Sequence, residues 1–353
     1  MTETRTYHEQ IRIDQTLRLR EVLKTLPPFA KDFFRAIEPR SSAKTRMNYA
    51  YDIRVFFHFL MENNPVYKNY TMDQFTVTDL ERLEPVDIEE YMEYLKVYKD
   101  AGDDYVTNGE RGLKRKISAL RSFYAYYFRH EMIKTNPTVL IDMPKIHEKA
   151  IIRLDADEVA RLLDYIEHCG DQLTGQKKAY YEKTKERDLA IVTLLLGTGV
   201  RVSECVGLDV EDVDFNNNAI KVTRKGGNEM FVYFGPEVEK ALKQYLPVRE
   251  GITPVPGHEH ALFYSTQRKR IGVQAVENLV KKYAREITTT KKITPHKLRS
   301  TYGTALYQET GDIYLVADVL GHKDVNTTRK HYAAMDDQRR RMAARAVKLR
   351  EEE

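Results

Sequence analysis

The chain has 353 residues, of which 42% are hydrophobic and 31% are charged, and its formal net charge at pH 7 is +4. This composition is typical of a globular protein, and at roughly 150 residues per domain the length predicts about two domains. Residues 1–15 lack the apolar core of a secretory signal, and the most apolar stretch, residues 189–196, is far shorter than the ~20 residues of a membrane span, so we expect a cytoplasmic protein that does not cross a membrane.

The region up to residue 140 has the hydrophobic spacing of a small helical bundle. Helices are predicted over residues 11–26, before Pro27 and Pro28, and over 41–62, 86–98 and 114–130. In the helix over 41–62, apolar side chains recur at the spacing of one helical face: Tyr49, Ile53, Phe56, Phe57 and Leu60. Such faces pack together around a common core.

The helix over residues 114–130 begins with a run of basic side chains. A solvent-exposed charged face explains such a run as well as DNA binding does, and a net charge of +4 supports nucleic-acid binding only weakly. Lysine and arginine on a rigid helix also follow DNA phosphates by displacing counterions. The sequence leaves both interpretations open, and the candidate DNA-binding residues are Lys114, Arg115, Lys116 and Arg121.

A second domain follows a linker at residues 141–153, which contains Pro144 and several charged side chains. Asp155 with Glu158 has the spacing of a capping box and predicts the start of a helix. An apolar helix over residues 188–196 comes next, then two strands over 219–223 and 230–234 around a Gly-Gly turn, and further helices from residue 273 onward. The predicted fold is mainly α with a small antiparallel β-sheet.

Three motifs in this domain hold side chains that bind anions. Arg201 follows a Gly-Thr-Gly turn, and Lys225 lies in the hairpin turn before two glycines. His296 and Arg299 lie one turn apart at the start of a helix that Thr294 would cap, where free backbone N–H groups favour a phosphate. Taken alone, Arg201 is better explained by a salt bridge and Lys225 by exposure to solvent. For His296 and Arg299 the structural and functional explanations are equally good.

The segment LGHKDVNTTRKHY, residues 320–332, holds two more candidates. Gly321 has the position of a helix C-cap, and His322 follows it directly. Asn326 would cap a further helix that carries Tyr332. A single tyrosine on a helix usually belongs to the core, but here it follows an arginine, a lysine, a His-x-x-Arg pair and a Gly-His pair in one domain.

Together, the segments TGVRVSE, RKGG, HKLRSTYGTAL and LGHKDVNTTRKHY resemble the tyrosine recombinase family, which includes phage integrases and Xer proteins. The resemblance spans residues 155–335. The pattern over 42–60 is similar to the family's helical core-binding domain, and LPPF at 26–29 resembles the Xer subgroup. The implied division of the chain has five parts: an N-terminal helical extension (1–28), a core-binding domain (29–140), a linker (141–153), a mixed α/β catalytic domain (154–335) and a C-terminal helix or tail (336–353).

The resemblance implies a catalytic role for Tyr332, Arg201 and Arg299. Tyr332 would attack a DNA phosphate to form a 3′-phosphotyrosyl link and release a 5′-hydroxyl group. Arg201 and Arg299 would hold the nonbridging oxygens, because fixed guanidinium groups stabilise a five-coordinate transition state more than the ground state.

The remaining three roles also come from the resemblance. Lys225 would protonate the leaving 5′ oxygen, His296 would assist the tyrosine proton, and His322 would donate a hydrogen bond to the phosphate. One departure is Ala333-Ala334 after the tyrosine, where many relatives carry a hydroxyl residue and then histidine; here the histidine is His331, before the tyrosine.

The implied function is site-specific recombination of duplex DNA without metal, cofactor or ATP. The implied partners are a DNA site with inverted repeats and further copies of the chain, as a dimer on the site and a tetramer in the synapse, joined through residues 336–353. Xer-like resolution of chromosome dimers is the first expectation, and integration or excision of a mobile element is the alternative. A DNA-binding regulator that does not cut is a remote alternative.

A metal-dependent nuclease is disfavoured because His296, His322 and His331 have no suitable carboxylate cluster in the sequence. The two cysteines, Cys169 and Cys205, belong to no CxxC pair and are expected to be reduced structural thiols.

Overall fold

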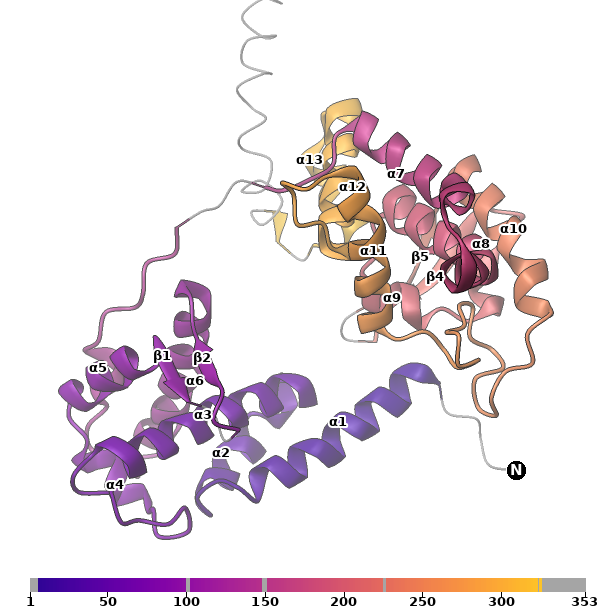
Figure 1. Ribbon diagram of the computed structural model, residues 1–353. Helices are drawn as coiled ribbons and strands as arrows, with labels where there is room; N and C mark the ends of the chain where they lie inside the picture. Colours follow the sequence, from indigo (N-terminus) through magenta and orange to yellow (C-terminus); the bar gives the residue numbers. More distant parts are fainter. Residues whose placement is uncertain (1–5, 100–101, 148–150, 225–226, 323, 326–353) are drawn as a thin grey trace, which may run out of the picture. The chain divides into compact units, whose positions relative to one another are not determined.

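The structure is a computed structural model that describes residues 6–99, 102–147, 151–224, 227–322 and 324–325 (Figure 1). The chain divides into two compact units, Met1–Lys149 and Ala150–Glu353. In the described ranges, no helix is both long and apolar enough to span a bilayer. The expected fold class, mainly α with little β-structure, is confirmed.

The first unit is a helical bundle with one short hairpin. Its elements are α1 (Tyr7–Leu23), α2 (Ala30–Ala36), α3 (Ala43–Asn63), α4 (Val77–Arg82), α5 (Pro85–Tyr94), β1 (Val97–Lys99), β2 (Tyr105–Thr107) and α6 (Glu110–Arg129), with 3₁₀ turns at Glu38–Arg40 and Pro137–Val139.

The expected apolar face of α3 lies in the core of this unit. Ile53, Phe56, Phe57 and Leu60 are each at most 1% exposed, and Tyr49 packs at the edge. Each fully buried side chain of this size stabilises the fold by about 1.5–3 kcal/mol relative to an exposed one. Helix α1 packs along α3 and adds apolar side chains to the same cluster, so residues 7–23 belong to the bundle itself.

The prediction for residues 86–98 is partly wrong. Helix α5 ends at Tyr94, and Val97–Lys99 instead pairs antiparallel with Tyr105–Thr107. Val97 and Tyr98 have side chains that favour strands, and their partner strand lies beyond the end of the predicted helix.

The second unit is a group of helices with a three-stranded sheet. Its elements are α7 (Ala156–His168), α8 (Gly175–Thr198), α9 (Val202–Gly207), β3 (Val213–Asp214), β4 (Ala219–Thr223), β5 (Glu229–Tyr233), α10 (Pro236–Glu250), α11 (Val273–Ile287), α12 (Pro295–Thr310) and α13 (Ile313–Leu320), with 3₁₀ turns at Cys169–Gln172 and Val210–Asp212.

Helix α8 is the centre of this unit. Ala190, Ile191, Leu194 and Leu195 are fully buried, and α7, α10 and α12 all pack on the helix. It is much longer than the predicted 188–196. The prediction missed its first half because that half is polar and shows no apolar stripe. The capping box of Asp155 and Glu158 at the start of α7 is confirmed.

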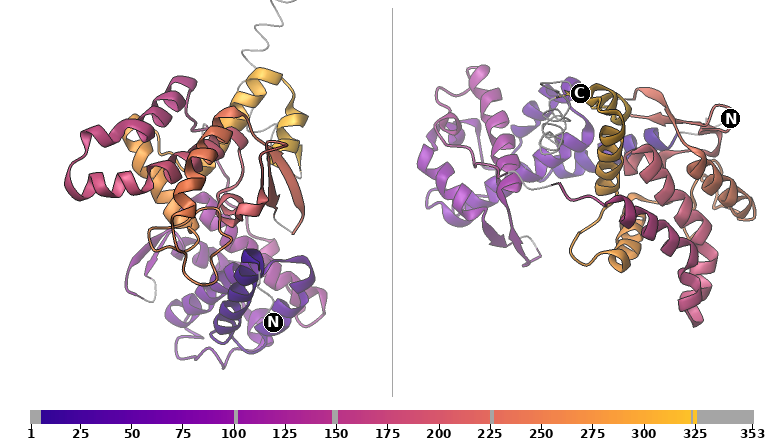
Figure 2. Two further views of the ribbon diagram at one scale, coloured as in Figure 1. Left: turned by 90° about the vertical axis from the view of Figure 1, so that its right-hand side faces the viewer. Right: turned by 90° about the horizontal axis from the view of Figure 1, so that it is seen from above.

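The predicted hairpin is confirmed with a shift of one residue in its second strand. Strands β4 and β5 pair antiparallel from Ala219 with Tyr233 to Thr223 with Glu229, and β3 pairs with the other edge of β4. The hairpin lies along one side of the helices of its unit (Figure 2). Helix α9 contacts β4, the central strand of this sheet.

Candidate active site

Arg201 is positioned by a turn that only glycine fits well. Helix α8 ends at Thr198, and its C-cap Gly199 has φ 62° in the left-handed region; a Cβ there would lie 2.4 Å from Cδ1 of Tyr302. The chain then reverses, and Arg201 becomes the N-cap of α9. The Gly-Thr-Gly motif thus fixes where the arginine side chain begins.

Glu204 holds Arg201 in place. Its carboxylate accepts a hydrogen bond from the Arg201 backbone N–H at 2.8 Å and a second one from Nη1 at 2.7 Å. The Glu204 side chain is 3% exposed, whereas that of Arg201 is 35% exposed. The buried acid therefore orients a guanidinium group that still reaches solvent. This contact is the salt bridge that the sequence left open as an explanation of Arg201, and it leaves part of the guanidinium available.

Arg299 comes from the first turns of α12, after Thr294 as N-cap and Pro295 at the first helical position. The side chain is 5% exposed and donates to the backbone carbonyls of Gly199 and Leu320. It therefore joins the end of α8 to the end of α13.

The carboxyl end of α13 brings three guanidinium groups together. Arg224 Nη2 donates to the Val319 carbonyl at 2.8 Å, Arg299 Nη2 donates to that of Leu320, and Arg201 Nη2 donates to that of Gly321 at 3.2 Å. Three successive carbonyls thus bind arginines from three distant segments. The partial negative charge at a helix C-terminus favours cations there, so these carbonyls hold side chains together that would otherwise repel one another.

The sequence did not identify Arg224 as a site residue. It directly precedes Lys225 in the hairpin, but no local pattern indicates that its side chain reaches α13. Burial lowers the pKa of Arg224; Arg201 lowers it as well, whereas Glu204 and Asp318 raise it. The site therefore places positive charge where it is poorly hydrated.

The backbone of His322, directly after α13, is held by a hydrogen-bonded turn. Gly321 has φ 61°, its N–H donates to the Asp318 carbonyl at 2.7 Å, and the His322 N–H donates to the Ala317 carbonyl at 2.9 Å. This pair of bonds is a Schellman motif, which explains the glycine that the sequence predicted as a C-cap. His322 is half-buried directly after the three carbonyls.

His296 lies on α12, one turn before Arg299, and is exposed. Helices α12 and α13 pack side by side (Figure 1), so both histidines belong to the same pair of helices. The structure thus brings Arg201 and Arg299 together at the turn that presents His322, with His296 at the start of the neighbouring helix.

Two predicted catalytic residues, Lys225 and Tyr332, lie outside the described residues, as do the predicted cap Asn326 and the C-terminal segment 336–353. For Lys225 the flanking hairpin is described: the Arg224 N–H donates to the Asn228 carbonyl at 2.7 Å. Among the side chains that the structure describes, no three His, Cys, Asp or Glu gather as ligands for a metal ion.

The four candidate DNA-binding residues of α6 have different surroundings. Lys114 is exposed, and Arg115 is 48% exposed while it donates to Asp52. Lys116 is buried and pairs with the same Asp52 carboxylate at 3.3 Å. Arg121 is half-buried and donates to the carbonyls of Thr138 and Ile141.

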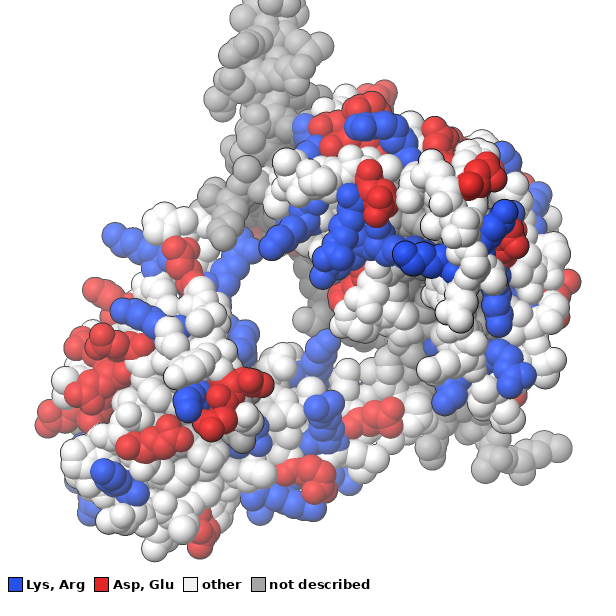
Figure 3. All heavy atoms as spheres, viewed as in Figure 1, with Lys and Arg blue, Asp and Glu red and all other residues white. Residues whose placement is uncertain are grey.

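The buried Lys116 and the bound Arg121 thus have structural partners, which corrects the idea of one basic face formed by all four. Burial raises the pKa of Asp52, while Lys116 and Arg115 lower it. Of the four predicted residues, Lys114 and Arg115 remain accessible as DNA-contact candidates. Acidic side chains gather instead over α5, where Glu89, Glu90 and Glu93 are exposed (Figure 3).

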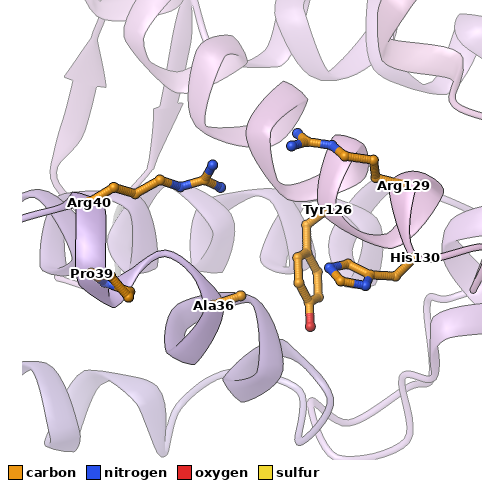
Figure 4. A pocket seen from close by; sticks show the side chains of 6 residues that line it. All are labelled: Ala36, Pro39, Arg40, Tyr126, Arg129 and His130. Carbon is orange, nitrogen blue, oxygen red and sulfur yellow. The ribbon is translucent and has the colours of Figure 1, made fainter.

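The first unit also has a basic pocket of about 240 Å³ between the α2 region and the end of α6. Arg40 and Arg129 extend toward one another above Tyr126, whose ring lies 4.5 Å from that of His130 (Figure 4). Its remaining lining residues are Ala36 and Pro39. The pocket is separate from the arginine cluster, which lies wholly in the second unit.

Each of the two units matches a known protein family. Residues 152–339 match the model of the phage integrase family, and residues 30–131 match the N-terminal SAM-like domain of phage integrases. Tyrosine recombinase XerC of Caldanaerobacter subterraneus subsp. tengcongensis is 33% identical, over 94% of this chain and 90% of the relative. Tyrosine recombinase XerS of Streptococcus equi subsp. zooepidemicus is 29% identical, over 92% of this chain and 96% of the relative.

Solved structures share the fold. One is the crystal structure of XerH site-specific recombinase bound to a palindromic difH substrate, a post-cleavage complex. Its TM-score is 0.63 at 21% identity, and the match covers 86% of this chain and 80% of the XerH chain. The Tn1549 transposon integrase in complex with circular intermediate DNA also has a TM-score of 0.63, at 20% identity. This match covers 89% of this chain and 98% of the integrase chain. The chain therefore belongs to the phage integrase family and is a site-specific tyrosine recombinase similar to the Xer proteins.

Proposed function

We propose that the chain cleaves and rejoins duplex DNA with Tyr332 as the nucleophile. The Tyr332 hydroxyl oxygen attacks the scissile phosphorus and its proton moves with the help of His296. The bond from phosphorus to the 5′ oxygen breaks, and Lys225 gives that oxygen a proton. The product is a 3′-phosphotyrosyl ester, which a 5′-hydroxyl group of another strand attacks in the reverse reaction. Each step exchanges one phosphate ester bond for another, so no ATP is needed.

The convergence of Arg201 and Arg299 at the end of α13 carries this proposal. Both guanidinium groups bind adjacent carbonyls directly before His322, although they begin on different helices. A diester phosphate offers two nonbridging oxygens, and paired guanidinium groups match such oxygens in geometry and charge. As the transition state gains negative charge, fixed cations stabilise it more than the bound substrate.

The DNA partner is supported by the relatives, whose solved structures include recombinases bound to their DNA substrates. In the first unit, Lys114 and Arg115 on α6 are the proposed phosphate contacts, since both remain accessible. We further propose a site with inverted repeats, a dimer on the site and a tetramer in the synapse, joined through residues 336–353. A chain truncated after residue 335 should then still bind its site, but native mass measurements should find no tetramer with DNA.

The role that best fits the curated relatives is resolution of chromosome dimers, because XerC and XerS match this chain over more than nine-tenths of its length. In cells, loss of the protein should then leave unresolved dimers at one chromosomal site. Loss that affects only the excision of a mobile element would contradict this role.

The nucleophile is tested with a nicked duplex that traps the covalent intermediate. The DNA is selected from random sequence by binding to the purified full chain and is resynthesised with the nick. Wild type should give a protein–DNA band that resists denaturant, and Tyr332→Phe should give none. Tyr314→Phe is the matched control, because Tyr314 is 71% exposed on α13 and has no proposed role. A band that persists in Tyr332→Phe contradicts the proposal.

The arginine clamp is tested on the same substrate. Arg299→Ala should slow formation of the covalent band on the order of 10²-fold or more, about 3 kcal/mol of transition-state stabilisation, while DNA affinity changes little. Thermal unfolding of the variant checks that the buried substitution leaves the unit folded. Equal losses of binding and cleavage would indicate a role in binding alone.

A further inference from the structure

Arg224 is the third arginine at the carboxyl end of α13, and the family resemblance gave it no role. It follows β4 directly, so the sheet fixes its backbone. Its side chain crosses to α13, where Nη2 donates to the Val319 carbonyl at 2.8 Å. The residue is half-buried, next to the carbonyls that bind Arg201 and Arg299.

The other side of this guanidinium group is buried. Nε and Nη1 of Arg224 are inaccessible to solvent and have no hydrogen-bond partner in the described parts of the chain. A buried donor without an acceptor costs free energy, and more so when the donor is charged. The nearby Glu204 carboxylate is already bound by the backbone and side chain of Arg201. Among the described residues, the site therefore has donors for an anion that no carboxylate satisfies.

We propose that Arg224 is a third phosphate-binding residue of the active site, whose Nε and Nη1 donate to an oxygen of the DNA phosphate held by Arg201 and Arg299. This proposal rests on the function proposed above and adds one residue to its substrate contacts. A phosphate oxygen carries a formal charge that a backbone carbonyl lacks, so it is the stronger acceptor for a guanidinium group.

Residue 321 is a glycine, so no side chain of that residue covers the Arg224 guanidinium group. A Cβ at this position would lie 1.2 Å from Nη1 of Arg224, so the Gly321 backbone lies directly against the guanidinium group. A phosphate reaches Nε and Nη1 when this turn shifts, and such a shift moves no side chain at position 321. The same shift would move His322, because that residue continues from the turn.

A purely structural role is the competing explanation, in which Arg224 only fastens the end of α13 to the hairpin. The two explanations differ in their dependence on phosphate charge. A residue that neutralises the phosphate matters little once that charge is removed, whereas a structural fastening matters equally for every substrate.

The experiment uses the full chain and the nicked duplex, with the scissile position first mapped with wild type. One substrate carries the normal phosphodiester, and the other carries a methylphosphonate there, in which an uncharged methyl group replaces one nonbridging oxygen. Arg224→Gln removes the charge, and because its side chain is shorter it also loses the bond from Nη2 to the Val319 carbonyl, a structural loss that both substrates share. Its covalent band should form about tenfold more slowly or worse with the phosphodiester, and within about threefold of wild type with the methylphosphonate.

The matched control is Arg249→Gln on α10. Arg249 is also buried and donates to backbone carbonyls, those of Ala261 and Glu259 at 2.9 and 2.7 Å. Any loss in this variant should be the same with both substrates and should follow its thermal unfolding. An equal loss for Arg224→Gln on both substrates, or no loss on either, overturns the proposal. Failure of the function itself would appear separately, as a covalent band in Tyr332→Phe.

Discussion

Glu204 binds Arg201 twice: one carboxylate oxygen lies 2.8 Å from the backbone nitrogen of Arg201 and the other lies 2.7 Å from Nη1. A single buried acid therefore fixes both the turn into α9 and the direction of the guanidinium group. Arg201 still reaches the Gly321 carbonyl with Nη2.

Glu204→Gln should lower catalysis more than DNA binding. The amide keeps the shape of the side chain but loses the charge that orients Arg201, and a hydrogen bond to a charged group contributes about 1.5–3 kcal/mol. We expect the covalent band to form about tenfold more slowly, with site affinity nearly unchanged in a gel-shift titration. Glu237→Gln, which changes an exposed acid in the first turn of α10, should match wild type. An unaffected cleavage rate in Glu204→Gln would show that Arg201 needs no such support.

Gly321→Ala should lower stability and cleavage by more than its backbone strain alone explains. A left-handed φ of 61° costs a non-glycine residue about 1–2 kcal/mol, and the new Cβ would also overlap the Arg224 guanidinium group. Gly175→Ala separates these effects, because Gly175 has φ 56° and nothing within 4 Å of its Cβ position. Denaturant unfolding and the covalent-band assay should both rank Gly321→Ala below Gly175→Ala. Equal behaviour of the two variants would mean that the contact with Arg224 has no consequence.

Lys114 should contribute to DNA affinity through charge alone. Loss of one phosphate contact to B-form DNA lowers the slope of log K against log salt by about 0.9. Lys114→Ala should show this change for specific and random duplexes alike. Arg82→Ala should not, because Arg82 pairs with Asp79 on α4, away from the basic start of α6. An unchanged salt slope in Lys114→Ala would remove this lysine from the interface.

Cys205 should be inert in the folded chain. The thiol is fully buried, and burial raises its pKa from 9.0 to about 12. At pH 8 only about one thiol in ten thousand would be thiolate, the form that reacts with thiol reagents. Reagent added to the native chain at pH 8 should leave Cys205 unmodified in a peptide map, and reagent added in denaturant should modify it.

The same shift has a consequence for stability. Because the folded pKa exceeds the unfolded one, the contribution of Cys205 is fully present below pH 9 and is lost as the pH rises toward 12. Cys205→Ala should therefore show a shallower loss of unfolding free energy across this window than wild type. An identical slope in both proteins would contradict the raised pKa.

Local patterns in the sequence determined much of this fold. The periodic apolar face of α3, the capping box of α7, the hairpin strands and the glycine cap of α13 all follow from spacing and backbone chemistry within a few residues. The ordered motifs also predicted one site made of Arg201, His296, Arg299 and His322, because the family resemblance groups residues that local spacing cannot relate.

Only the tertiary structure decided which cations are buried and which groups they contact. Lys114 and Lys116 are both lysines on one helix, yet the second is buried against Asp52, which lies on α3 and far away in sequence. Arg224 was missed for the same reason: its acceptor, the Val319 carbonyl, lies on a helix that packing alone brings to the hairpin. The first half of α8 is helical without an apolar stripe: residues 175–180 are exposed, and Tyr181 ties this half to α7 by donating to the carbonyls of Ile166 and Glu167. Spacing governs contacts within one element, whereas contacts between elements depend on how all the buried faces fit together at once.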